Sequence, residues 1–163
     1  MQITKPNLGT STRNGHTAPV RRGLPDEREA ITHKFTVGGH EGYITVGLYS
    51  DRTPGEVFIT MSKEGSTIRG LMDSVGILVS LALQHGIPLT KMADKFRYSR
   101  FDPQGPAIGC GEITMASSVL DYVFHWLIIR FTAEGESLRE WKPEKDMTAV
   151  KTDTAAPLDP TKP

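Results

Sequence analysis

The feature that most constrains the fold is a change in the spacing of apolar residues near residue 65. Before it, apolar residues alternate with others, as Ile44, Val46 and Leu48 do, and a period of two is typical of a strand with one buried face. After it, apolar residues recur every three or four positions, as in an amphipathic helix. The order of these two patterns predicts strands followed by helices, which is an α+β fold.

The first half of this pattern predicts a meander of three antiparallel strands. Residues that favour strands run from His33 to Val37 and from Tyr43 to Tyr49, with a glycine-rich turn at 38–42 between them. A turn at 51–55 leads to a third strand over 57–61.

Two helices are expected next. The first spans about 68–83, is capped at its start by Ser66 or Thr67, and ends before Gly86 and Pro88. A shorter helix follows Thr90 and should bury its apolar residues, Met92 and Phe96.

A last helix is expected from about Ser117 to Phe131, after a loop over 101–111. Its apolar residues cover more than one face, so it lies either centrally or at a subunit interface. We therefore expect a homo-oligomer that associates through this helix. The complete expectation is α+β, with an antiparallel sheet of about three strands packed against two long helices and one short helix.

Composition divides the chain into three parts. Residues 1–24 hold basic but no acidic residues, residues 135–163 are polar, and residues 25–134 carry the apolar patterns. We expect a flexible basic arm, one domain and a disordered tail. The arm is either a solvated leader or a charge-steered contact with a partner or nucleic acid. The whole chain has 19 basic and 19 acidic residues, so it has no overall field for nucleic acid or membranes.

The single cysteine, Cys110, excludes an internal disulfide and any redox pair within the chain. It points to a reducing compartment. The N-terminus has no apolar signal core, and the apolar run at 126–129 is too short to span a bilayer. We expect a cytoplasmic protein with no membrane partner.

Two loop regions could bind a ligand. In the first turn, Gly39 allows a close approach to the backbone, while His40 and Glu41 could transfer a proton; the alternative is an ordinary hairpin turn. The second region is the start of the first helix, where free N–H groups suit a phosphate; the alternative is a plain capped helix. Its candidate residues are Lys63, Ser66, Thr67 and Arg69.

A third region combines Arg97 and Arg100 with Tyr98 and Phe101. Such a cluster could stack on a base and hold a phosphate, or it could cover an edge of the core. The five histidines have no zinc-like spacing with one another or with Cys110, so we predict no metal site. We also predict no cofactor and no catalytic residue.

A long, ordered resemblance runs from about Arg21 to Phe131. Its segments include HKFTVGGHEGYITVGLY, PGEVFITMSKEGSTIRGLMD, SLALQHGIPL, KFRYSRFDPQG and SSVLDYVFHWLIIRF. Together they resemble a region near the C-terminal end of the adenosylcobalamin (vitamin B12)-dependent ribonucleotide reductases.

The resemblance implies a context of nucleotide reduction without the reductase barrel. That chemistry uses cysteine pairs, whereas this chain has one cysteine, so it cannot be a reductase alone and no family catalytic residue is transferred. The leading hypothesis is a stand-alone, non-catalytic accessory or regulatory module that binds a reductase-like protein. The alternative is a small-molecule binding protein that senses or sequesters a nucleotide. A third hypothesis is an enzyme based on His40 and Glu41. It is the least favoured of the three, because no nucleophile can be named.

Overall fold

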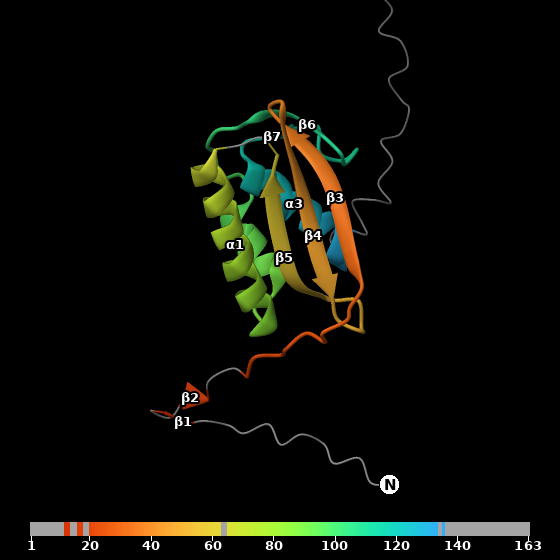
Figure 1. Ribbon diagram of the computed structural model, residues 1–163, viewed down its shortest axis with the longest axis vertical. Coiled ribbons are helices and arrows are strands. Elements are labelled where there is room, and N and C mark those ends of the chain that lie inside the picture. The colour runs from red at the N-terminus through yellow and green to blue at the C-terminus, as the bar shows by residue number, and fades with distance from the viewer. Residues whose placement is uncertain (1–11, 14–15, 18–19, 63–64, 134, 136–163) are drawn as a thin grey trace, which may run out of the picture.

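The computed structural model describes residues 12–13, 16–17, 20–62, 65–133 and 135. It confirms the α+β class (Figure 1). The main sheet is antiparallel, with the strand order β5-β4-β3-β6-β7. A separate pair, β1 (Thr12–Arg13) and β2 (His16–Thr17), lies within the expected basic arm.

The expected meander is present as β3 (Ala30–Val37), β4 (His40–Leu48) and β5 (Pro54–Met61). The first turn is tighter than expected, since Val37 pairs directly with His40 and only Gly38 and Gly39 connect the strands. Their φ angles of +56° and +86° suit glycine and define a two-residue hairpin turn. As predicted, one face of β4 is apolar and fully buried.

The sheet has five strands where we expected about three. The additional strands are β6 (Gly105–Ile108), which pairs with β3, and β7 (Met115–Ala116), which pairs with β6. The sequence predicted a loop over 101–111 in place of β6. The strand was missed because β6 is short and contains glycine and proline, which ordinarily indicate a loop.

The helices also differ in detail from the expectation of two long and one short. They are α1 (Ser66–Gln84), α2 (Leu89–Phe96) and α3 (Val119–Phe131), of 19, 8 and 13 residues. Neither Ser66 nor Thr67 is the N-cap of α1, because the helix already begins at Ser66 and Gly65 takes the N-cap position without a side-chain hydrogen bond.

Helix α1 lies along the outer edge of β5 (Figure 1). The backbone N–H of Val57 donates to Ser80 Oγ at 2.9 Å, and Gln84 Nε2 donates to the carbonyl of Gly55 at 3.0 Å. Gly76 lies so close that an added Cβ would be 2.8 Å from the carbonyl oxygen of Val57. The helix therefore satisfies a strand edge that would otherwise be open to pairing with another chain.

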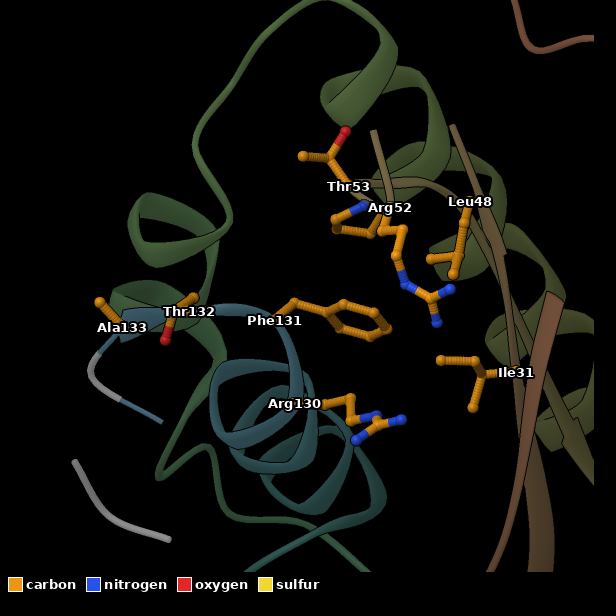
Figure 2. A pocket seen from close by; sticks show the side chains of 9 residues that line it. Ile31, Leu48, Arg52, Thr53, Arg130, Phe131, Thr132 and Ala133 are labelled. Atoms are coloured by element: carbon orange, nitrogen blue, oxygen red, sulfur yellow. The ribbon is translucent and has the colours of Figure 1, made fainter. Parts of the chain in front are cut away.

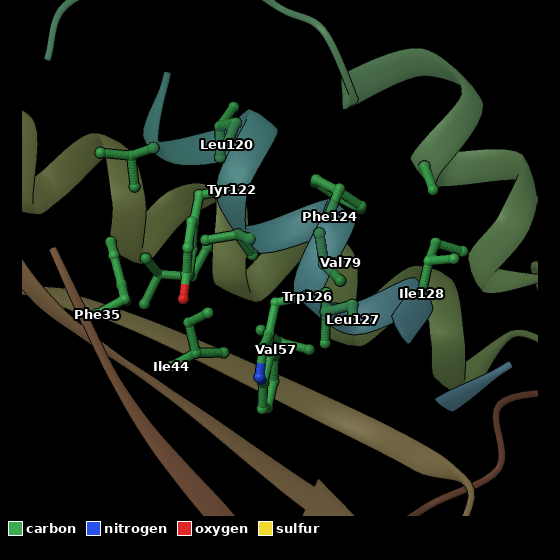
Figure 3. Packing of buried hydrophobic residues seen from close by; sticks show 14 of the residues in the cluster. Phe35, Ile44, Val57, Val79, Leu120, Tyr122, Phe124, Trp126, Leu127 and Ile128 are labelled. Carbon is green, nitrogen blue, oxygen red and sulfur yellow. The ribbon is translucent and has the colours of Figure 1, made fainter. Parts of the chain in front are cut away.

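Helix α3 is a central element of the core. Tyr122, Phe124 and Leu127 are each 0% exposed. In Figure 3, Tyr122 points toward the strands that carry Phe35 and Ile44, while Phe124 points away from them. Phe124 stacks on Phe96 of α2 at 4.9 Å between ring centroids.

The prediction that α3 needs a second copy to cover its apolar surface is therefore wrong. One side of α3 packs on the sheet and the other packs on α2, all within one chain. Phe96 was expected to be buried, but it remains 36% exposed because only one of its sides lies on α3.

The unpartnered apolar surface belongs to α1 instead. Leu71, Ile77, Leu78 and Leu81 are 57%, 61%, 66% and 40% exposed. The window Thr67–Gln84 has the length and composition of a membrane-crossing helix, which the sequence analysis overlooked. Core helices of soluble proteins meet the same criterion, and the inner side of α1 packs on β5.

The end of the expected basic arm contacts the domain. Arg21 Nε donates to Gln84 Oε1 at 2.7 Å, and the hydroxyl of Tyr49 donates to the carbonyl of Arg22 at 2.6 Å. The guanidinium of Arg22 also pairs with Asp51 at 2.9 Å. The division at 24/25 and 134/135 stays a prediction, since most of the two outer parts lies outside the described residues.

Candidate functional site

A partly buried polar pair joins α3 to the sheet. The hydroxyl of Tyr122 lies 2.9 Å from Nε2 of His33, and the imidazole of His33 stacks on Trp126 at 4.5 Å between ring centroids. Burial raises the pKa of Tyr122 and lowers the pKa of His33. Both side chains are thus neutral near pH 7, and one hydrogen bond joins the phenol to the imidazole. This pair stabilises packing and supplies no charged catalyst.

The one cysteine is equally unreactive. Burial, followed by the hydrogen bond from its Sγ to Glu112 at 2.9 Å, raises the pKa of Cys110 to about 11. The side chain is a protonated thiol at neutral pH, whereas nucleophilic attack and metal binding require the thiolate. Among the described residues, no three His, Cys, Asp or Glu side chains gather closely enough to hold a metal ion.

At the predicted site in the first turn, the Glu41 carboxylate forms an ion pair with a residue of the neighbouring strand. Glu41 pairs with Nζ of Lys34 at 2.6 Å, and the hydroxyl of Tyr43 donates to Glu41 at 3.3 Å. Lys34 lowers the pKa of the Glu41 carboxyl. His40 and Glu41 are successive residues of β4, so their side chains leave opposite faces of the strand. Gly39 is exposed at the turn itself.

The predicted site at the start of α1 lies beside this turn, since the N–H of Ser62 donates to the carbonyl of Glu41 at 2.8 Å. Thr67 and Arg69 are exposed there. Lys63 and the side chain of Ser66 lie outside the described residues.

The third predicted cluster is held by a buried carboxylate. Asp121 is 4% exposed and accepts hydrogen bonds from the N–H groups of Tyr98 at 2.6 Å and Ser117 at 2.8 Å. Arg97 lies 3.9 Å from Asp94. The exposed ring of Tyr98 stands edge-on to His125 of α3, whose Nδ1 lies 3.0 Å from the carbonyl oxygen of Asp121.

Arg100 belongs to a separate pocket of about 320 Å³. The pocket is also lined by Gln104 and Gly105, and Gln104 lies against Gly38, beside the first turn. The structure thus places the turn, the start of α1 and the Arg100 pocket toward one end of the domain.

A larger pocket, of about 440 Å³, was missed by the sequence analysis. It lies at the other end of β3 and β4, where Arg52 of the β4–β5 turn approaches Arg130 and Phe131 at the end of α3. Figure 2 shows both guanidinium groups extending into the same space as the ring of Phe131. No spacing signal marks this site, because its residues come from three separate segments. The described residues that line it are Ile31, Leu48, Arg52, Thr53, Pro54, Arg130, Phe131, Thr132 and Ala133.

Comparisons with known proteins identify relatives of the whole domain. Over 113 residues the chain is 53% identical to a vitamin B12-dependent ribonucleotide reductase of Rhodopirellula baltica and 48% identical to one of Streptantibioticus cattleyicolor. It is 44% identical over 111 residues to the reductase of the same name from Bradyrhizobium diazoefficiens. This confirms the resemblance read from the sequence.

The matches cover 69%, 69% and 68% of this chain but only 11%, 19% and 9% of those relatives. The chain is therefore similar to a small part of each reductase. No solved structure matches it. Residues 16–130 match the TSCPD domain, which covers more than half of the sequence. The chain belongs to the TSCPD domain family.

Proposed function

We propose that this chain is a non-catalytic accessory module that binds a reductase-like protein in the cytoplasm. The observation that carries the proposal is the match itself, which spans most of this chain but only 9% to 19% of relatives named as vitamin B12-dependent ribonucleotide reductases. In those relatives the same domain shares a polypeptide with a much larger protein. A surface that suits such a neighbour is therefore expected here.

The absence of an activated thiol supports a non-catalytic role. The sequence contains one cysteine, and its pKa is raised to about 11 by burial and by Glu112. A cysteine pair cannot form within the chain, and the thiol present is not a nucleophile at neutral pH.

The outer face of α1 is the surface that suits a protein partner. It consists of Leu71, Ile77, Leu78 and Leu81, each at least 40% exposed, and α1 holds only two charged residues, Arg69 and Asp73. A contiguous exposed apolar surface of this kind marks a protein contact more often than a solvated helix face. We assign it to the reductase-like partner because the relatives carry this domain within a longer reductase chain.

The test is a binding assay between the full chain and a purified vitamin B12-dependent ribonucleotide reductase. Leu78→Glu should abolish binding, because it places a charge in the apolar contact. Ile108→Glu is the matched control, since Ile108 is 69% exposed but lies on β6, and it should bind normally. No binding by the wild-type chain would contradict the proposal. A dimer of the chain alone that Leu78→Glu dissociates would assign the face to a second copy.

A second candidate function is nucleotide binding near the first turn. It is favoured by the common location of that turn, the start of α1 and the pocket of Arg100. In a thermal-shift assay, a nucleotide at a hundred times its Kd should stabilise the fold by about 2.7 kcal/mol. Lys63→Ala should weaken that effect if the site is used. A screen in which no nucleotide raises the Tm would remove this candidate.

A further inference from the structure

We propose that the pocket between Arg52 and Arg130 binds a small organic anion through both its charge and an apolar body. The site lies outside every region that the sequence pointed to, and it is independent of the reductase contact on α1. Its volume of about 440 Å³ falls within the range of about 300–1,000 Å³ that is typical of small-molecule sites.

The apolar part of the pocket is built from the core. Leu48 is 3% exposed and belongs to the core cluster, while Ile31 and Phe131 pack against that cluster from the pocket side. The ring of Phe131 is held edge-on to Trp126 at 6.0 Å between centroids. These walls would remove apolar surface of a ligand from water, which an exposed charged patch cannot do.

Arg52 is held over the pocket by a well-defined turn. Its backbone has φ +63°, a conformation that L residues other than Asn and Asp seldom adopt, and its N–H donates to the carbonyl of Tyr49 at 2.8 Å. Asp51 closes the same turn by accepting from the N–H of Thr53 at 3.0 Å. The turn therefore fixes the backbone position from which the Arg52 side chain extends.

Arg130 provides the second positive charge. It lies in the last turn of α3 and is exposed. Within the described part of the chain, no hydrogen bond or ion pair engages its guanidinium. The carbonyl end of the helix dipole would disfavour an anion here, but Thr132 caps the carbonyl of Ile128 through its hydroxyl at 2.7 Å.

The two guanidinium groups favour an anionic ligand. Within the described ranges, Arg52 pairs with one acidic residue, Glu29, at 3.1 Å, and both side chains of that pair are more than two-thirds exposed. None of the described residues that line the pocket is acidic. A carboxylate or phosphate head would accept hydrogen bonds from both arginines, whose planar donors suit such groups, while the rest of the molecule rests on Ile31, Leu48 and Phe131.

The test is calorimetric titration of the full chain with octanoate, adenosine 5′-monophosphate and inorganic phosphate. At least one organic anion should bind, and inorganic phosphate should bind more weakly because it has no apolar body. Octanoate alone would identify an aliphatic carboxylate as the ligand class, and the nucleotide alone would identify a phosphate ester. Failure of both organic anions to bind at millimolar concentration would overturn the proposal, as would equal binding of inorganic phosphate.

Two variants locate the site. Arg130→Gln should weaken binding at least about tenfold, or about 1.4 kcal/mol. It should not disturb the fold, because the Arg130 guanidinium makes no hydrogen bond or ion pair with the described residues. Arg52→Gln should act in the same direction. Lys91→Gln, which removes an exposed cation on α2, is the control and should leave affinity unchanged. Equal affinity in all three variants would exclude this pocket, whatever Leu78→Glu does to reductase binding.

Discussion

The hydroxyl of Tyr122 on α3 lies 2.9 Å from Nε2 of His33 on β3, and this bond joins the central helix to the sheet. The hydroxyl is screened from water, since Tyr122 is 0% exposed, and His33 is partly buried. Removing the hydroxyl with Tyr122→Phe leaves the ring nitrogen without its hydrogen-bond partner. We expect a loss of about 1–3 kcal/mol in the free energy of unfolding, measured by urea denaturation. Tyr98→Phe, at a site 74% exposed, should change stability little.

Stability should fall in mildly acidic solution because of His33. Burial lowers its pKa below the ordinary 6.5 in the folded chain, so the unfolded chain binds a proton more readily. The stabilisation is therefore complete above about pH 6.5 and is lost as the pH falls below that value. Urea denaturation between pH 8 and pH 5 measures how the free energy of unfolding depends on pH. His33→Gln should reduce this pH dependence, and an unchanged dependence would show that other groups cause it.

The contact of Gly76 with β5 should not tolerate a larger residue. In Gly76→Ala the new Cβ would meet the carbonyl oxygen of Val57 at 2.8 Å, and α1 would have to move off the strand. We expect a loss of about 1–3 kcal/mol. Gly70→Ala in the same helix has nothing within 4 Å and should gain about 0.5–1 kcal/mol from helix propensity. Thermal denaturation of the two variants compares them directly, and equal effects would contradict the close packing.

The carboxylate of Asp121 should control the mobility of the segment that carries Tyr98. In Asp121→Ala the N–H groups of Tyr98 and Ser117 lose their acceptor. Their amide hydrogen exchange should accelerate, and the domain should lose about 1–3 kcal/mol. Asp94→Ala, whose side chain is 58% exposed, is the control. Unchanged exchange at Tyr98 in Asp121→Ala would mean that the segment is held by other contacts.

The candidate sites were partly accessible from the sequence. The first turn was recognised because paired glycines carry a local backbone signal, and Arg97 and Arg100 stood out beside aromatic residues. The role of Asp121 as an acceptor for the N–H groups of Tyr98 and Ser117 was not predicted. No single sequence spacing relates the carboxylate to both donors. Whether the predicted residues bind a ligand stays a prediction.

Periodicity by itself determined the identity of β3, β4, β5 and the three helices, because a buried face requires a repeat of two in a strand and of about three and a half in a helix. Other features depended on tertiary structure. The strand β6 exists because β3 offers a partner, and α3 is covered on its second side by α2 rather than by another copy. Arg52 and Arg130 meet only because the β4–β5 turn and the end of α3 reach the same end of the sheet. Contacts of this kind join segments that are distant in sequence, so no local pattern specifies them.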